Sequence, residues 1–395
     1  MEQKSGSTTR GSGPLAGIKV VEYGLFHAGP GASAILGDLG ADIIKVELPE
    51  GDFMRDWSRM GSNLLSLPSG KSIMFEFANR NKRDICVDIR TEKGRKIFER
   101  LIGQADVFLT NIRKSTKQAA AVDYESIRKI KPDIIHANVS GYGPKGPLAD
   151  LGAFDPMGQA RSGMMYISGN DEPVLIQLAI LDQTTCIAAS HAIITALFAR
   201  ERSGKGQEVH ASLFSTAMWM MYMNMVITSA SQFDPNVKWD RSVMSPVRNS
   251  FRCGDGKWMM GVHHPEDKYW PILCSAVGAD HLIDDPRYRE LPGRAENSAE
   301  LTRKFDDIFA SRSRDEWIEI LLAHGLMFTP VQTMKEVFED PQALANDYVV
   351  SYEHSELGPI KIPGYPIHFS EFEVGTRFLS PELGEQTTEI LTELG

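Results

Sequence analysis

Short apolar runs alternate with segments of helical periodicity through the first half of the chain. The apolar runs, which are rich in β-branched residues and have the length of strands, occur at 18–23, 41–47, 83–88, 105–110 and 133–139. The helical segments between them occur at 29–39, 92–102 and 125–130. Because this alternation is typical of parallel βαβ units, the sequence predicts an α/β fold with a doubly wound, mostly parallel sheet.

The pattern changes after residue 206. A strand is predicted at 207–211 and a methionine-rich apolar helix at 215–227, and turn-rich stretches that contain tryptophan follow. The α/β pattern resumes at 325–340. The predicted parts are a flexible polar tail (1–14), a large α/β domain in two segments (15–210 and 331–395), a linker helix (211–227) and a smaller α+β domain (228–330).

The bulk composition excludes several classes of protein. A net charge of −10 over 395 residues argues against nucleic-acid binding, which usually needs a basic surface. No apolar run approaches the ~18 residues of a membrane span, and the N-terminus has no apolar core for export. The four cysteines are far apart and form no CxxC motif, which indicates reduced thiols. We therefore expect a cytoplasmic protein without a membrane segment.

Several motifs that would indicate other chemistry lack their context. The GxGxxG match at 141–146 is interrupted and followed by prolines, where a dinucleotide site needs a helix. The segment 69–72 resembles the end of a phosphate-binding loop but lacks that loop's first glycine, and no GxSxG hydrolase motif occurs. His263 and His264 are adjacent and cannot share one helical face, so we expect no metal site.

Asp182 is the most informative residue of the chain. It ends an almost wholly apolar run at 174–181, and a stretch of small residues with helical spacing follows at 184–197. A carboxylate at the point where a buried run meets the start of a helix lies in a semi-dry environment near the positive end of the helix dipole. Asp182 is therefore a candidate functional carboxylate, and the alternative role is that of a simple helix cap.

Six segments, in order, resemble the class III CoA-transferase family, which includes formyl-CoA, carnitine and bile-acid CoA-transferases. They are PLAGIKVVEYGLFHAGPGASAILGDLGADIIKVE (14–47), NRNKRDICVD (79–88), DVFLTN (106–111), NVSGYGPKGP (138–147), FDPMGQARSG (154–163) and FARERSGKG (198–206). The resemblance covers the chain from about residue 15 to its end. It implies a large α/β domain built from both chain ends, a smaller middle domain, and two subunits interlocked as a dimer.

The same resemblance implies the reaction. Asp182 occupies the place of the family's nucleophile, which attacks an acyl-CoA donor to give a mixed anhydride and then an aspartyl-CoA thioester. Coenzyme A then passes to a carboxylic acid acceptor, so CoA is a substrate and no tightly bound cofactor is expected. A second possibility is an acyl-CoA racemase of the same fold, but the family's GHD segment is GAFD at 152–155, without histidine. A third is one subunit of a hetero-oligomer with a homologous sister chain.

Further site residues follow from the resemblance. Phe26 and His27 lie in the loop where the family contacts pantetheine and the thioester, although His27 could also be an ordinary loop histidine. Asn111 ends a predicted strand at the edge where α/β sheets bind ligands. Asp155 matches an acidic position near the nucleophile and either positions Asp182, raises its pKa, or simply begins a helix.

The remaining residues assigned by resemblance concern the nucleotide end of CoA. Val87, Ile89 and Arg90 fall where the family packs adenine and meets phosphate. Lys114 and Lys117 could reach phosphates in place of a family arginine, or could be solvated surface residues.

The chain departs from the family in one loop and offers one hint about the acceptor. The region 241–251 lacks the run of glycines that forms a mobile lid in some members. The methionine and aromatic residues at 218–225 suggest a roomy apolar pocket, which favours a bulky or aromatic acceptor acid.

Overall fold

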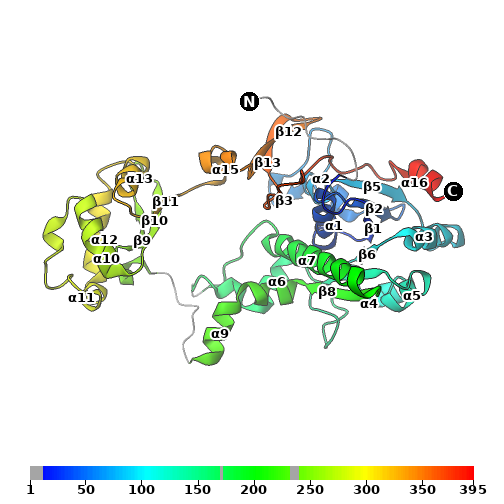
Figure 1. Ribbon diagram of the computed structural model, residues 1–395, viewed down its shortest axis with the longest axis horizontal. Helices are drawn as coiled ribbons and strands as arrows, with labels where there is room; N and C mark the ends of the chain where they lie inside the picture. The colour runs from blue at the N-terminus through cyan, green and yellow to red at the C-terminus, as the bar shows by residue number, and fades with distance from the viewer. Residues whose placement is uncertain (1–11, 170–171, 232–239) are drawn as a thin grey trace. The chain divides into compact units, whose positions relative to one another are not determined.

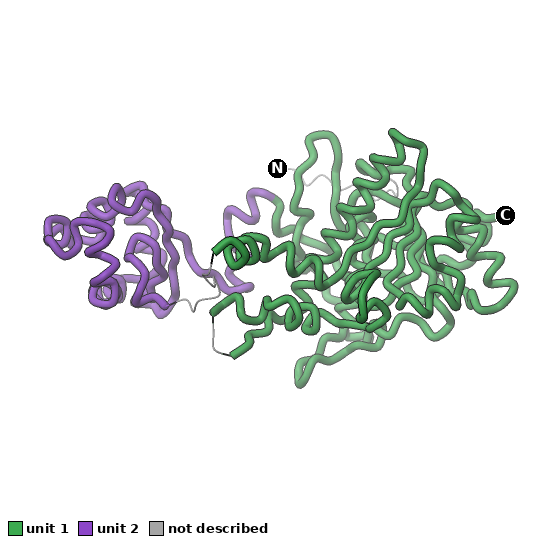
Figure 2. The backbone as a smooth tube through the Cα atoms, turned by 90° about the horizontal axis from the view of Figure 1, so that it is seen from below, with its two compact units in different colours: residues 1–237, 347–395 green, residues 238–346 purple. Residues whose placement is uncertain are grey.

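The structure, a computed structural model, describes residues 12–169, 172–231 and 240–395 (Figure 1). Residues 1–11 of the tail predicted at 1–14 lie outside the described residues. Two compact units divide the chain: one combines residues 1–237 with 347–395, and the other comprises 238–346 (Figure 2). Both chain ends therefore contribute to the larger unit.

The larger unit is built on a six-stranded sheet in which all neighbouring strands are parallel. In chain order the strands are β1 (Lys19–Tyr23), β2 (Asp42–Glu47), β5 (Lys82–Cys86), β6 (Val107–Thr110), β7 (Ile135–Ser140) and β8 (Gln207–Ser212). Their order across the sheet is β5-β2-β1-β6-β7-β8. This Rossmann-like order reverses direction between β1 and β6, and the carboxyl edge at such a switch point is where doubly wound folds bind ligands. The predicted α/β fold with a parallel sheet is confirmed.

Helices cover both faces of this sheet (Figure 1). The helices α1 (Ala28–Asp38) and α7 (Ile180–Ser203) pack on one face. The helices α3 (Glu92–Gln104), α5 (Tyr124–Ile130) and α16 (Thr387–Leu394) pack on the other. Val20 and Val21, which are consecutive on β1, are both buried and belong to the two different cores. Double coverage explains why the strands were visible as continuous apolar runs.

The contact between α1 and α7 depends on small residues. A Cβ atom added to Gly31 would lie 2.4 Å from Sγ of Cys186, so only glycine allows this approach. The contact brings the first turns of both helices, with His27 before one and Asp182 inside the other, to the same side of the unit.

Shorter elements complete the larger unit. They are β3 (Arg59–Met60), β4 (Asn63–Leu64), α2 (Ile73–Ala78), α4 (Lys114–Ala119), α6 (Asp155–Ser162), α8 (Leu213–Met220), α9 (Tyr222–Ala230), β12 (Val349–His354) and β13 (Gly358–Pro363). The C-terminal segment is tied to the sheet, because Arg83 on β5 forms ion pairs with Glu389 and Glu393 of α16.

The smaller unit has a three-stranded antiparallel sheet with an aromatic core. Its strands are β9 (Arg248–Arg252), β10 (Trp258–Val262) and β11 (Phe328–Val331), in the order β11-β10-β9. Its helices are α10 (Glu266–Ala276), α11 (Leu291–Glu296), α12 (Ser298–Phe309), α13 (Arg314–Ala323), α14 (Met334–Val337) and α15 (Pro341–Ala345). Because β11 pairs with β10, the smaller unit continues to residue 346, whereas the sequence placed the boundary at 330.

Two local expectations were wrong. The apolar run at 174–181 is not buried as expected: Val174, Ile176 and Leu178 are exposed in this chain, and only Leu181 is buried. The helix expected at 215–227 is divided into α8 and α9 by a break at Met221.

The helix α7 is longer than expected, because it begins before Asp182 and extends to Ser203. By length and composition alone it could cross a membrane. In the structure it packs along α1, β7 and β8 as the central helix of an α/β core.

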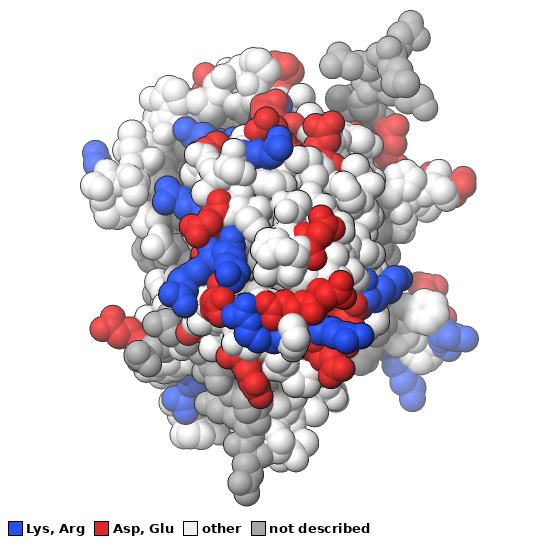
Figure 3. All heavy atoms as spheres, turned by 90° about the vertical axis from the view of Figure 1, so that its left-hand side faces the viewer, with Lys and Arg blue, Asp and Glu red and all other residues white. Residues whose placement is uncertain are grey.

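Acidic and basic side chains are interspersed on the face of the molecule shown in Figure 3. This face carries no broad basic patch of the kind that binds nucleic acid.

Candidate active site

A pocket of about 830 Å³ opens at the carboxyl edge of the parallel sheet. Its walls come from the loops after β1, β6 and β7, from α4, from β8 and from the first turn of α7. The predicted site residues that line it are Phe26, His27, Asn111, Lys114, Lys117 and Asp182. The pocket therefore lies at the switch point of the strand order and joins residues from 26 to 182 of the sequence.

Asp182 is the third residue of α7 and is half-buried. The residue before the helix, Ala179, has a left-handed backbone conformation and offers no side-chain cap. The cap comes instead from Asp155 at the start of α6, whose Oδ2 accepts the backbone N–H groups of Leu181 at 2.6 Å and Asp182 at 3.0 Å. Asp155 and not Asp182 therefore caps the helix, so the Asp182 carboxylate is not used in capping.

The surroundings of Asp182 disfavour the ionised form of its carboxyl group. Burial, with a further contribution from the negative charge of Asp155, raises its pKa from the usual 3.8 to about 7. Its side chain has no hydrogen-bond or ion-pair partner among the described residues. An unpartnered, partly desolvated carboxylate is a better nucleophile than a solvated one, because less hydration has to be removed before it attacks.

Gln159 holds the segment that leads to Asp182, and sequence reasoning did not identify it. This fully buried residue donates from Nε2 to Oδ1 of Asp155 and to the carbonyl oxygen of Ile176, and its Oε1 accepts the N–H of Ile176 at 3.1 Å. Asp155 and Gln159 are four residues apart on α6, so they lie on the same helix face. That spacing is the signal by which the sequence could have revealed the pair.

His27 precedes the first turn of α1 and lies against Gln183, the residue after Asp182. Its Nε2 is 2.9 Å from Oε1 of Gln183. Its Nδ1 is buried and has no partner within the described part of the chain. Burial lowers the pKa of His27 below its usual value near 6.5, so the imidazole is neutral near pH 7 and Nε2 donates to Gln183.

The loop between β1 and α1 is held in an unusual conformation. Phe26 has a φ of +59°, which costs energy for a bulky residue. Asn111 fixes the preceding residue, since its Oδ1 accepts the N–H of Leu25 at 2.9 Å and its Nδ2 donates to the oxygen of Leu25 at 2.6 Å. The Phe26 ring makes edge-to-face contact with Phe154 at 5.2 Å between ring centres.

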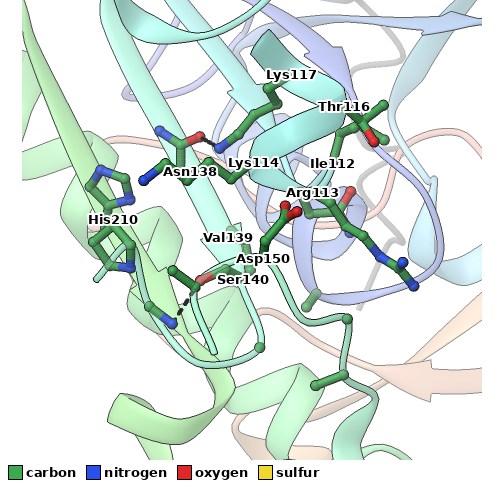
Figure 4. Close-up of a pocket in the computed structure, with 18 of the residues that line it drawn as sticks. Ile112, Arg113, Lys114, Thr116, Lys117, Asn138, Val139, Ser140, Asp150 and His210 are labelled. Atoms are coloured by element: carbon green, nitrogen blue, oxygen red, sulfur yellow. Dashed lines mark hydrogen bonds between the residues drawn. The ribbon is translucent and has the colours of Figure 1, made fainter. Parts of the chain in front are cut away.

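Cationic side chains line another part of the pocket. Lys117 reaches from α4 to Oδ1 of Asn138 on β7 (Figure 4). Burial lowers the pKa of this ammonium group. Lys114 and Arg113 are exposed at the rim and have no ion pair among the residues that the structure describes. Arg113 was missed by the sequence analysis, although it directly precedes the predicted Lys114.

Three of the residues assigned to the nucleotide do not line this pocket. Val87 and Ile89 are buried in the core between the sheet and α3. Arg90 is exposed and pairs with Asp88 at 2.7 Å and with Glu50 at 2.9 Å. Their assignment to adenine and phosphate stays a prediction.

The methionine-rich residues at 218–225 do not line the pocket either, so the hint that they form an acyl pocket finds no support in this chain. The aromatic residues that do line it are Phe26, Phe53, Tyr124 and Phe154. Phe53 and Phe154 are more than half exposed, which leaves an apolar wall beside Asp182. Within the described residues, no cluster of three or more His, Cys, Asp or Glu side chains is arranged to hold a metal ion.

The fold and the pocket together define an α/β enzyme with a carboxylate at the switch point of a parallel sheet. The model of the CoA-transferase family III matches residues 15–387, and the chain belongs to this family. It is 33% identical to an acyl-CoA transferase of Fusarium pseudograminearum over 98% of this chain and 86% of that protein. It is 31% identical to human succinyl-CoA:glutarate CoA-transferase over 96% of this chain and 86% of that protein.

A solved structure shows the same architecture. The crystal structure of a CAIB/BAIF family protein from Brucella suis matches with a TM-score of 0.85 and 31% identity, over 97% of this chain and 100% of that one. The chain is accordingly an enzyme of the family III CoA-transferase class.

Proposed function

We propose that this enzyme moves coenzyme A from an acyl-CoA donor to a carboxylic acid through covalent intermediates on Asp182. The observation that carries the proposal is the Asp182 carboxylate itself, which lies in the pocket without a side-chain partner while Asp155 caps its helix.

The first half of the reaction loads CoA onto the enzyme. An oxygen of Asp182 attacks the thioester carbon of the donor, and the C–S bond breaks to give a mixed anhydride and a CoA thiolate. The thiolate then attacks the Asp182 side-chain carbonyl, which releases the donor acid as a carboxylate and leaves an aspartyl-CoA thioester. The nucleophiles and leaving groups are all anions, so no proton transfer and no general base are required.

The second half reverses these steps with the acceptor. The acceptor carboxylate attacks the aspartyl thioester and displaces the CoA thiolate. The thiolate then attacks the acceptor's acyl carbon in the new anhydride, which forms the product acyl-CoA and regenerates the Asp182 carboxylate. One thioester replaces another, so the reaction requires no ATP and no cofactor besides the CoA substrate.

The pocket residues receive roles in this scheme. Phe26 and His27 contact the pantetheine and thioester, and Asn111 fixes their loop through Leu25. Lys114 and Lys117 provide positive charge for the phosphates of CoA. Asp155 positions Asp182 through the backbone of α7.

The proposal keeps the predicted CoA contacts of Val87, Ile89 and Arg90, which would meet the adenine and a phosphate. Arg90 would have to exchange its ion pairs with Asp88 and Glu50 for the phosphate.

The acceptor is proposed to be a bulky or aromatic acid. Support comes from the exposed rings of Phe53 and Phe154, which a large acyl group would cover next to Asp182. A panel of free acids of graded size, incubated with an acyl-CoA and followed by mass spectrometry of the CoA products, tests this. Faster transfer to small acids such as formate would contradict it.

The active form is proposed to be an interlocked homodimer in the cytoplasm, with a homologous sister subunit as the alternative partner. Trp219, Tyr222 and Met223 around α9 are 74%, 52% and 65% exposed, and a second subunit would remove these apolar surfaces from water. The chain also leaves the larger unit and returns to it, which threading requires. An active monomer in analytical ultracentrifugation at nanomolar concentration would refute the arrangement.

The direct test of the chemistry is the substitution Asp182→Asn. We expect transfer to fall to background, while circular dichroism and binding of CoA stay close to those of the wild type. Turnover within about tenfold of wild type in a clean preparation would assign the nucleophile elsewhere.

A further inference from the structure

Four fully buried charged residues lie beneath the loop between β1 and α1. Glu22 is on β1, Lys45 on β2, Lys82 on β5, and Asp52 follows β2; each is at most 3% exposed. Lys45 contacts Glu22 at 3.0 Å and Asp52 at 3.2 Å, and Lys82 contacts Glu22 at 2.6 Å. The two positive and two negative charges balance. We call these four residues the charge clamp.

Every donor of the two ammonium groups has an acceptor, and one acceptor of each is a backbone oxygen of the loop or of the first turn of α1. Lys45 donates its third hydrogen bond to the carbonyl oxygen of Gly24 at 3.0 Å. Lys82 donates to the carbonyl oxygen of Pro30 at 2.8 Å and to Oδ1 of Asn79 at 2.8 Å. The two lysines therefore hold both ends of the segment that carries Phe26, His27 and Ala28.

Asp52 holds the middle of the same segment. Its carboxylate oxygens accept the N–H of Phe26 at 3.1 and 3.2 Å, and Oδ1 also accepts the N–H of Met54 at 3.0 Å. Phe26 is the residue with the unfavourable φ of +59°, so this contact fixes the backbone at its most strained point.

Stability alone does not account for such a cluster. Removing four charges from water costs several kcal/mol for each ion, and apolar residues of similar volume often serve a fold equally well. Although burial by itself would raise the pKa of Glu22, the charges of Lys45 and Lys82 lower it to about 2. The carboxylate of Glu22 therefore stays ionised throughout the physiological range.

We propose that the charge clamp positions the Phe26–Ala28 backbone against Asp182, so that Glu22, Lys45, Asp52 and Lys82 are positioning residues for catalysis. None of the four lines the pocket itself. Their effect passes through the loop to His27, which is hydrogen-bonded to the neighbour of Asp182. The catalytic part of this inference rests on the proposed function, and the structural part does not.

The chain contains an internal reporter of the loop. Cys186 is fully buried one helical turn after Asp182, and its Sγ lies 3.5 Å from the oxygen of His27 and 3.4 Å from that of Ala28. Burial raises the pKa of this thiol, so it should react slowly while the loop is closed over it. Cys253 and Cys274, which are buried in the smaller unit, report unfolding of that unit instead.

The test compares two Asp→Asn substitutions at buried positions. Asp52→Asn removes a charge from the clamp, while Asp38→Asn removes an equally buried charge at the far end of α1, where Asp38 pairs with Arg80. Each variant is labelled with N-ethylmaleimide and mapped by mass spectrometry. Asp52→Asn should raise the labelling rate of Cys186 at least fivefold without changing Cys253 and Cys274, and Asp38→Asn should leave Cys186 within twofold of wild type.

The kinetic prediction is equally specific. Asp52→Asn should lower kcat at least tenfold with KM within about threefold of wild type, while Asp38→Asn should keep kcat within about twofold. Equal responses of the two variants, or an unchanged Cys186 rate in Asp52→Asn, would overturn the proposal. A wild-type protein that shows no CoA transfer would refute the proposed function while the labelling result still decided the clamp.

Amide hydrogen exchange on the wild type gives a second measurement that needs no variant to fold. Peptides that cover 24–30 should exchange as slowly as those of β1, because the N–H groups of Leu25 and Phe26 are bonded to the side chains of Asn111 and of the buried Asp52. Exchange within seconds at neutral pH would contradict a fixed loop.

Discussion

The two segments that meet at the pocket are held by different means. The β1–α1 loop rests on four buried charges and on Asn111, all from the sheet or the loops next to it. The segment before Asp182 is exposed, and Asp155 and Gln159 of α6 hold it by hydrogen bonds to its backbone. The β1–α1 loop is thus held by many charged and polar contacts, whereas the segment before Asp182 is held by one carboxylate and one amide.

The difference has an electrostatic consequence. The two positive and two negative charges beneath the loop balance one another, so they exert no net charge on the loop. The negative charge of Asp155 lies against the start of α7 and helps to raise the pKa of Asp182. The unfavourable electrostatics therefore act on Asp182 and not on the loop, and we expect substitutions in the two segments to have distinguishable effects.

The largest effect in this comparison is expected from Asp155→Ala. It leaves the N–H groups of Leu181 and Asp182 without their acceptor and removes the charge that raises the pKa of Asp182. We expect kcat to fall about 100-fold, and the free energy of unfolding to fall by about 1–2 kcal/mol, as for a lost helix cap. Steady-state kinetics and urea unfolding measure both, and activity close to wild type would show that the nucleophile needs no such support.

The pH dependence of the wild type should report the same strained group. In the proposed mechanism only the ionised Asp182 attacks. Since burial and Asp155 raise its pKa to about 7, kcat/KM, which reports the free enzyme, should rise with pH through about 7. In Asp155→Asn the inflection should move to lower pH, because the neighbouring charge is gone. A profile that is flat between pH 5 and 8 would argue against a raised pKa.

Stability should change in the opposite direction from activity in Asp182→Asn. Because the folded pKa of Asp182 is raised above its usual 3.8, the protonated form stabilises the fold, and this contribution is lost as the pH rises through 7. Asparagine has no such charge, so the variant should be more stable than wild type at pH 8, by on the order of 1–3 kcal/mol, and similar to it near pH 4. Urea unfolding at the two pH values checks this, and a variant less stable than wild type at pH 8 would contradict it.

The smallest effect is expected from His27→Gln. Glutamine can still donate to Gln183 and can replace the neutral imidazole as a polar contact for the thioester. We expect kcat/KM to change by less than about fivefold, while His27→Phe, which cannot donate, should lose more than tenfold. A loss as large as that of Asp182→Asn in the glutamine variant would indicate proton transfer by His27.

Much of the fold could be predicted because the strands are buried on both faces of the sheet. Their sequences are therefore continuous apolar runs. The start of α7 could not, because Ala179 has a left-handed conformation and its helix is capped by Asp155 from another element. The exposure of the run at 174–181 could not be predicted either. Its apolar composition is typical of a buried segment, yet most of it is exposed in this chain.

The site residues likewise divide into those that could be predicted from the sequence and those that could not. Asp182 and the residues after β1 and β6 could be placed by resemblance and by strand ends. Gln159 and the clamp residues act through contacts between distant segments, such as Lys82 with Pro30, which no local pattern contains.

The central claim is that Asp182 carries the covalent intermediates. Mixing the enzyme with an acyl-CoA and then with hydroxylamine should convert an activated carboxyl group to a hydroxamate, which peptide mapping by mass spectrometry locates. We predict the hydroxamate on Asp182, dependent on the acyl-CoA and absent from Asp182→Asn. A hydroxamate on Asp155 or on another acid, or none in an enzyme that is turning over, would contradict the claim.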